Sequence, residues 1–489
     1  MDSARMKSLT RFQFQAFGQL ERPPAYHFLV EEHEWYADDT ENTLGVLFRD
    51  KIDDDWAYVV MRRGPDSKFR CVEVDSSFET IETARIMLLS EIDRVSREIE
   101  QTGVSTSKAI ADLVRSINGR DPFKPIVPTH RRNSLYKVVA EHEAYSPARG
   151  MIREVYDSYV DLDGNFIEQF QTTGFDSRIW ELYLHAYLVD AEFSLLPSVR
   201  PDFVVSKGGI TLGIEAVTAN PTQNLQLSER DNGYPSVILH TPPFDYKVPV
   251  LDASFVEKEK DFVPIKLGSA LYSKLKKHYW ELDNMTERPI IFAIETFHDR
   301  ESLHYSSVAL GTYLYGYHHE HLWDPDGRLI IVPRKVDSHV YAGKTIPSGF
   351  FSLPEAKHVS AVLFSNSGTI SKFNRMGQMG RHRNPRIRLI RQGTCYNPDP
   401  NASTPAVFAY EVGDPRYQEW WGQGLEMFHN PVATHLVDRW LFPGIVHHRF
   451  EDGMIYTEAP EFHPIASFTI NIAGTRRGDS FELGDAARD

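Results

Sequence analysis

Apolar and polar positions near the N-terminus follow patterns that predict a small sheet and one helix. Three runs rich in β-branched and aromatic residues predict strands at 43–50, 56–63 and 69–78, because turn-forming residues separate them. A helix is predicted from about Glu82, where apolar residues recur every three or four positions. These positions are Ala84, Met87, Leu88, Ile92 and Val95. Residues 1–105 are therefore expected to form a small α/β domain.

The rest of the chain alternates between helical and strand-like patterns. Residues 106–149 hold a polar, proline-interrupted stretch and are expected to form a linker. A second domain is expected over 150–470, followed by a polar tail over 471–489. The expected elements of the second domain are a helix at 176–190, strands at 200–205 and 210–217, a loop at about 220–262, a helix at 265–280, and strands at 289–297, 328–336, 358–366 and 387–393. This order predicts an α/β (α+β) fold with a β-rich C-terminal part.

Two of these strands flank Gly208-Gly209, a pair that favours a two-residue hairpin turn. In that hairpin Lys207 faces Ile210, and the same register places Asp202 opposite Glu215. Directly opposed residues of an antiparallel pair have Cβ atoms about 4.5–5.5 Å apart, and like charges in this arrangement are destabilising. A divalent cation with oxygen ligands is the simplest group that would hold the two carboxylates together. A shift of the turn by one residue would place them on opposite faces.

A third carboxylate belongs to the predicted helix at 176–190, with Asp176 as its expected cap. This helix is apolar nearly all round, which is typical of a helix covered on several sides. Glu181 interrupts the apolar surface, and His185 follows one turn later on the same side. A buried carboxylate is costly unless it is paired or bound to a metal ion. Glu181 is therefore a candidate metal ligand, and the alternative is that it pairs with His185 or Arg178.

In this order, the residues Glu181, Pro201-Asp202 and Glu215-Ala216-Val217 resemble the PD-(D/E)xK nuclease superfamily. The resemblance covers residues 175–297 and implies a restriction-endonuclease-like αβββαβ core, a mixed sheet flanked by helices. It implies a metal-dependent endonuclease that hydrolyses phosphodiester bonds of DNA, by analogy in prokaryotic defence against foreign DNA. Asp202, Glu215, Glu181 and the carbonyl of Ala216 would hold Mg²⁺ or Mn²⁺. The metal ion would lower the pKa of a bound water and neutralise charge on the phosphate.

The chain departs from the family pattern at Val217, where the family has a catalytic lysine. A lysine from the predicted helix at 265–280 is a candidate replacement. With about 100° per residue, Lys274 lies about 20° from Leu267 on the apolar side of that helix. Catalysis would require its amine within about 8 Å of the Asp202 and Glu215 carboxylates. The alternative is that the Lys274 stem follows the apolar stripe while the amine stays in water.

Charge is distributed unevenly along the chain. The 53 Lys and Arg against 68 Asp and Glu give a net charge of −15, which argues against a protein coated with nucleic-acid-binding surface. No acidic residue occurs between Ala356 and Pro398, however, and this segment suits a basic loop that follows phosphates. The candidate nucleic-acid-binding residues are Lys372, Arg375, Arg381, Arg383, Arg386 and Arg388. The alternative is that these cations pair with acids elsewhere.

Several protein classes are excluded or disfavoured by composition and motifs. No apolar run approaches the roughly 20 residues of a bilayer span, and the N-terminus lacks a secretion-type apolar region, so neither a membrane protein nor a secreted one is expected. Two cysteines predict a reduced, cytoplasmic protein rather than a disulfide scaffold. Phosphate-binding loops, dinucleotide fingerprints and serine-hydrolase elbows are missing from the sequence.

Three functional readings remain from the sequence. The first is the Mg²⁺-dependent nuclease, with a homodimer as a reasonable arrangement for cutting two strands. The second is a catalytically inactive nuclease-fold protein that serves as a nucleic-acid-binding or scaffolding subunit, which Val217 favours. The third treats Asp202 and Glu215 as the acid pair of a glycosidase, although acids on adjacent paired strands do not readily flank a sugar bond. The sequence leaves the strandedness of the substrate open.

Overall fold

The computed structural model describes residues 6–15, 17, 29–64, 69–102, 121–219, 257–296, 307–414 and 419–473. These residues form a mixed α+β protein with helices packed on several sheets, which confirms the expected fold class. Most of the expected loop at 220–262 and the end of the expected tail lie outside the described residues. Within the described part, no helix combines the length and apolarity that crossing a bilayer requires.

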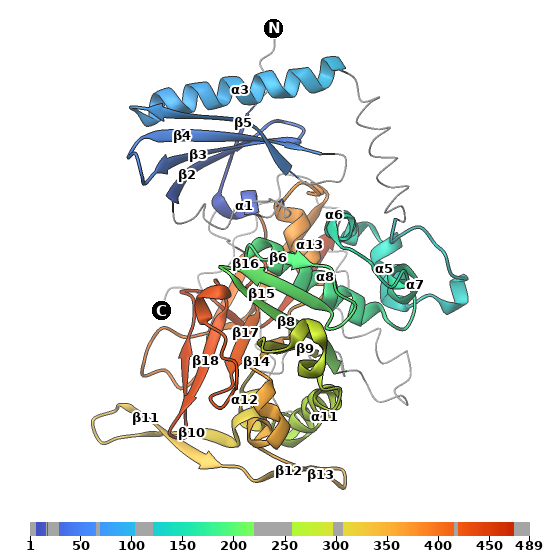
Figure 1. Cartoon of the computed structure of the whole chain (residues 1–489), viewed down its shortest axis with the longest axis vertical. Coiled ribbons are helices and arrows are strands. Elements are labelled where there is room, and N and C mark those ends of the chain that lie inside the picture. Colours follow the sequence, from blue (N-terminus) through green and yellow to red (C-terminus); the bar gives the residue numbers. More distant parts are fainter. Residues whose placement is uncertain are drawn as a thin grey trace.

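The N-terminal unit is an antiparallel sheet in the order β1-β2-β3-β4-β5. The three predicted strands are β3 (Thr43–Asp50), β4 (Trp56–Arg63) and β5 (Phe69–Phe78), and β1 (Lys7–Leu9) and β2 (Val30–Ala37) were not predicted. The short helix α1 (Arg11–Gln15) lies beside the sheet, and the long helix α3 (Ile81–Thr102) covers one face (Figure 1).

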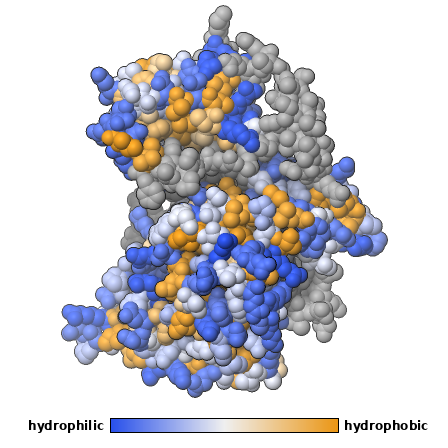
Figure 2. Space-filling view, in the orientation of Figure 1, coloured by the Kyte–Doolittle hydropathy of each residue, from blue (hydrophilic) through white to orange (hydrophobic). Residues whose placement is uncertain are grey.

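The helix α3 packs through most of the predicted apolar positions. Ala84, Leu88, Ile92 and Val95 are buried against Leu47, Tyr58 and Val60 of the sheet. Met87 was predicted to share this face, but its side chain is 39% exposed. The other four positions form the buried stripe of the helix. Figure 2 shows hydrophobic residues interspersed with hydrophilic ones on the face of this unit that is in view.

The expected linker is wrong for residues 121–149. This segment contains η1 (Thr129–Arg131), α5 (Ser134–Glu141), η2 (Glu143–Tyr145) and the start of α6 (Ser146–Ser158). Phe123, Tyr136 and Val139 are buried in the same apolar cluster as the helix that carries Glu181. The prolines of this stretch separate short helices that pack into the core, and residues 103–120 lie outside the described part.

The largest sheet has eight strands in the order β19-β18-β17-β14-β9-β8-β7-β6. Its strands in chain order are β6 (Ser194–Leu196), β7 (Phe203–Lys207), β8 (Ile210–Ala219), β9 (Ile290–Thr296), β14 (Ala361–Ser365), β17 (Leu425–His429), β18 (Val446–Glu451) and β19 (Met454–Glu458). Strands β6, β7 and β8 form an antiparallel meander, whereas β8, β9 and β14 run parallel. Strands β9 and β14 are buried along their full length, as expected for parallel strands covered on both faces.

Helices cover both faces of this sheet (Figure 1). One apolar cluster joins the sheet to α6, α7 (Phe166–Gln171), α8 (Phe175–Asp190) and α13 (Ile370–Met379). The other cluster joins it to α11 (Val263–Leu275) and α12 (Ser307–Tyr315), with η3 (Lys258–Phe262) preceding α11. The crossover from β8 to β9 includes α11, and the candidate carboxylates Glu181, Asp202 and Glu215 lie on α8, directly before β7 and on β8.

A third sheet and two hairpins complete the described structure. Strand β15 (Ile387–Cys395) lies between β16 (Ala406–Glu411) and β20 (Pro464–Ala473), all antiparallel. The hairpins are β10 (Tyr317–Trp323) with β11 (Leu329–Lys335), and β12 (Ser338–Tyr341) with β13 (Lys344–Pro347). The predicted strands at 328–336, 358–366 and 387–393 correspond to β11, β14 and β15. Short 3₁₀ turns lie at Tyr279–Glu281, Asp283–Met285, Phe350–Ser352, Pro354–His358 and Arg439–Leu441.

Candidate functional site

The glycine turn forms where the sequence predicts it. Gly208 and Gly209 have φ angles of 57° and 80°, which L-residues adopt only at a cost. Lys207 pairs with Ile210, and the ladder continues to Phe203 opposite Ile214. The next position in this register is Asp202 opposite Glu215. Asp202 Oδ2 accepts a hydrogen bond of 2.8 Å from the backbone N–H of Ala216, so this carboxylate lies against strand β8 beside Glu215.

Lys274 of α11 reaches the carboxylate of Glu215. Its Nζ lies 2.5 Å from Glu215 Oε1, well inside the reach of about 8 Å that a catalytic role requires. Glu215 is buried, and the Lys274 side chain is only 22% exposed. The expectation that this amine points inward is therefore confirmed, and the alternative of a fully solvated amine is wrong. The catalytic role of Lys274 stays a prediction.

Tyr279 is a site residue that the sequence pattern did not indicate. A continuous helix was expected over 265–280, but α11 ends at Leu275 and His278 adopts a left-handed conformation with φ 49°. This reversal brings Tyr279 back to the sheet, where its hydroxyl donates a hydrogen bond of 2.5 Å to Glu215 Oε1. Burial and this hydrogen bond raise the pKa of Tyr279, so the phenol remains a donor at neutral pH.

Glu181 is buried and paired, in agreement with one of the two alternatives. Arg178 Nη1 lies 2.5 Å from Glu181 Oε2, and the Tyr159 hydroxyl donates to the same oxygen over 3.2 Å. His185, the other proposed partner, contacts Ser158 Oγ instead, at 2.8 Å from Nε2. Burial raises the pKa of Glu181, and Arg178 opposes this effect. The expected cap at Asp176 is also wrong, because α8 begins at Phe175 after Gly174 and Asp176 lies in the first turn.

The three carboxylates influence one another electrostatically. Burial first, and then repulsion from Glu215 and Glu181, raises the pKa of Asp202 to about 7, while Lys274 lowers it. The described residues contain no group of three or more His, Cys, Asp or Glu side chains arranged to hold a metal ion. Glu181 is therefore not shown as a direct third ligand beside Asp202 and Glu215, since its carboxylate is engaged by Arg178 and Tyr159.

A cavity of about 510 Å³ opens next to Asp202. It is lined by the chain after α6, by one side of α8, by the segment around β6 and by the start of β7. Asp202 belongs both to this lining and to the carboxylate pair on the hairpin, and Tyr159 and Arg178 line it as well. A cavity of this volume is in the range that holds a small organic molecule or part of a larger one.

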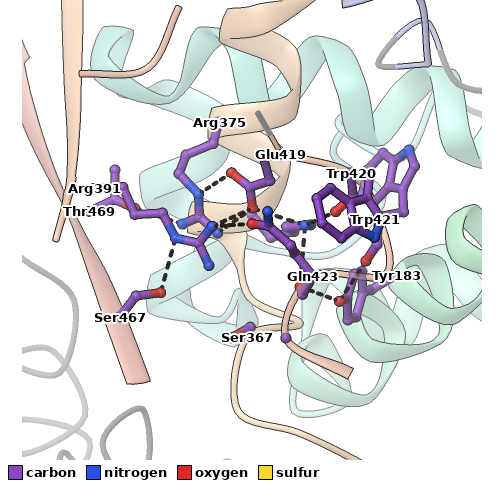
Figure 3. A network of polar contacts seen from close by, with 12 residues as sticks. Tyr183, Ser367, Arg375, Arg391, Glu419, Trp420, Trp421, Gln423, Ser467 and Thr469 are labelled. Carbon is purple, nitrogen blue, oxygen red and sulfur yellow. Dashed lines mark hydrogen bonds and ion pairs between the residues drawn. The ribbon is translucent and has the colours of Figure 1, made fainter. Parts of the chain in front are cut away.

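The basic segment at 356–398 is not the predicted phosphate-binding loop. Lys372 and Arg375 belong to α13 and are buried, so they do not face an external polyanion. Figure 3 shows the interior cluster in which Arg375 and Arg391 converge on Glu419. Lys372 Nζ lies 2.9 Å from Glu419 Oε1, and burial lowers the pKa of Lys372 to about 7. The assignment of Lys372 and Arg375 to nucleic-acid binding is therefore wrong.

The remaining cations of the basic segment differ in exposure. Arg388 pairs with Glu411 and is largely buried, so the alternative of pairing with distant acids is correct for it as well. Arg381, Arg383 and Arg386 are exposed around the turn between α13 and β15. Of the six predicted nucleic-acid-binding residues, these three keep a surface position from which contact with phosphate is feasible.

Comparisons of the chain with protein-family models, with curated proteins and with solved structures give no match. The candidate functional site consists of the carboxylate pair of the hairpin, the lysine and tyrosine that contact it, and the adjoining cavity.

We predict that Glu419→Gln destabilises the fold by about 3–5 kcal/mol, because it leaves buried cations without their shared carboxylate. Glu419 accepts hydrogen bonds from Lys372 and Arg375 and lies 3.3 Å from Arg391 Nη1. Urea denaturation followed by circular dichroism measures the change. Glu411→Gln, at the more exposed pair with Arg388, is the matched control and should cost less than about 1 kcal/mol. Equal costs would contradict the special role of Glu419.

We predict that Asp202→Asn stabilises the metal-free protein, and more so at pH 8 than at pH 4. Because the folded state raises the pKa of Asp202, the protonated form is the favoured one, and the fold loses stability as the pH rises from about 4 to about 7. The amide removes this loss, so a gain of up to about 4 kcal/mol is expected at pH 8. Thermal denaturation at both pH values tests this, with the exposed turn variant Asp326→Asn as control. A gain that does not depend on pH would contradict the prediction.

Proposed function

We propose that the chain is a divalent-metal-dependent endonuclease that hydrolyses phosphodiester bonds of DNA. The observation that carries the proposal is the contact between Lys274 and Glu215, across from Asp202 on the glycine hairpin. This contact places a cationic amine next to two acids, and the PD-(D/E)xK pattern requires these three groups. At the sequence position where the family has its lysine, this chain has Val217 instead. Val217 is buried in the apolar cluster of α11, so this helix can contribute the amine from the same face of the sheet.

The order of the elements supports the same proposal. Helix α8 with Glu181 precedes the β6–β7–β8 meander, and α11 with Lys274 precedes the parallel strand β9. This is the order helix, three strands, helix, strand that the resemblance implies for residues 175–297. The carboxylates lie where the meander and the parallel strands meet.

The two carboxylates at the hairpin are the proposed ligands of Mg²⁺ or Mn²⁺. The hydrogen bonds found among the described residues use Oδ2 of Asp202 and Oε1 of Glu215, which leaves the second oxygen of each carboxylate for a cation. Hard divalent cations prefer such oxygen ligands, and the Ala216 carbonyl is a further candidate. A cation would also relieve the repulsion that raises the pKa of Asp202. When bound, the metal would supply a water of lowered pKa and neutralise charge on the phosphate.

The side chains around the pair have separate roles in this proposal. Tyr279 and Lys274 hold Glu215 in one orientation through the same oxygen. The Lys274 amine is a donor that can stabilise negative charge on a phosphate oxygen next to the site. Glu181 would act at a distance, by keeping Arg178 and Tyr159 in place beside Asp202. Arg381, Arg383 and Arg386 are the surface cations proposed to contact the DNA backbone.

We predict that Lys274→Met lowers the rate of oligonucleotide cleavage about 100-fold or more, because it removes charge stabilisation without changing side-chain volume greatly. Mn²⁺ binding, measured by calorimetry, should persist in Lys274→Met and be lost in Glu215→Gln. The matched control is Lys276→Met, an exposed lysine near the end of the same helix, which should cleave as the wild type does.

Two results would overturn the proposal. Cleavage by Glu215→Gln at the wild-type rate would place the chemistry elsewhere in the molecule. A wild-type protein that neither binds Mn²⁺ nor cleaves plasmid or oligonucleotide would instead favour the inactive nucleic-acid-binding subunit, which Val217 at the lysine position also favours.

A further inference from the structure

The cavity beside Asp202 has features that its role next to a metal site does not require. Its lining comes from four separate parts of the chain: residues 158–163, α8, residues 192–199 and the start of β7. A site for a metal ion and a backbone phosphate needs only the carboxylate pair and nearby donors. The additional volume of about 510 Å³ is therefore available to another part of the substrate.

Four apolar side chains in the lining of this cavity are exposed to solvent. Among its lining residues, Val160 is 67% exposed, Leu162 is 48% exposed, Leu196 is 42% exposed and Val199 is 63% exposed. Single exposed apolar side chains are common on protein surfaces, but four on the lining of one cavity indicate a binding surface for an apolar or aromatic group.

The lining of the cavity also combines aromatic rings with carboxylates. Tyr159, Phe193 and Phe203 contribute rings, and the acids are Asp161, Asp163, Glu192 and Asp202. Among the described residues of the lining, Arg178 is the one Lys or Arg, and it already binds Glu181 and Gln169. The negative charge of the four acids repels phosphate, whereas their carboxylate oxygens accept hydrogen bonds from amino groups. The chemistry favours a planar, uncharged ring that carries N–H donors.

We propose that this cavity binds a single unpaired nucleobase that carries an amino group, namely adenine, cytosine or guanine. The inference rests on the proposed function and specifies its substrate. Because Asp202 belongs to both sites, a base in the cavity belongs to a nucleotide next to the phosphate at the carboxylate pair. A base that enters a protein cavity must leave its stack and its pairing partner. The substrate is therefore single-stranded DNA or DNA with locally unpaired bases.

Nucleoside binding tests the cavity without metal and without catalysis. Titration of the full chain with adenosine, cytidine, guanosine and thymidine, followed by ligand-observed NMR, should show binding of the first three and weaker binding of thymidine, which lacks an amino group. The double variant Leu162→Ser/Val199→Ser should weaken binding about tenfold or more, because it removes apolar contact with the base. The control Val407→Ser/Val432→Ser changes two similarly exposed valines outside the lining and should bind as the wild type does.

Cleavage assays separate a failure of this inference from a failure of the proposed function. The wild type should cleave a single-stranded oligonucleotide at least about tenfold faster than its duplex, and the Leu162→Ser/Val199→Ser variant should lose this preference while binding Mn²⁺ normally. Equal cleavage of both substrates, with no nucleoside binding, would overturn the base-binding role and leave the nuclease standing. Nucleoside binding without Mn²⁺ binding or cleavage would support the cavity and overturn the nuclease.

Discussion

The register of one hairpin determines where the proposed chemistry of this protein lies. The turn at Gly208-Gly209 aligns β7 with β8 so that Asp202 and Glu215 occupy opposed positions, and every other candidate group is placed relative to them. Lys274 contacts Glu215 from α11, and Glu181 belongs to α8, which packs with the other apolar cluster of the sheet. Helices must therefore pack on both faces of the sheet before the four side chains of the candidate site, those of Asp202, Glu215, Lys274 and Glu181, are all in place. Burying these acids close together has an energetic cost. It is seen at Asp202, whose pKa is raised by burial and by its carboxylate neighbours.

Local patterns were sufficient to predict several of the elements and the hairpin. Three of the N-terminal strands have the predicted bounds, and β7 and β8 pair in the predicted register because a Gly-Gly turn between β-rich runs allows few alternatives. The inward direction of Lys274 followed from helical periodicity alone. Each of these predictions uses only residues that lie within about twenty positions of one another in the sequence.

The features that the sequence did not predict depend on contacts between distant segments. Residues 121–149 were expected to be a linker because they are polar and rich in proline, yet Phe123 and Tyr136 pack into the core of the large domain. Lys372 and Arg375 were expected on the surface because no acid lies near them in sequence, but Glu419, more than forty residues away, brings them inside. Tyr279 reaches Glu215 only because α11 ends early, which helical periodicity does not reveal.

The arrangement around Glu419 has a consequence for how this sequence can change over evolutionary time. One acid serves several bases, so its loss is harmful while the bases remain, whereas the loss of a single base removes only part of an excess of positive charge. Descendants of this chain can reach an apolar interior here only through an ordered series of substitutions in which the glutamate is replaced last. The glutamate should therefore persist in divergent descendants after some of its basic partners have been replaced.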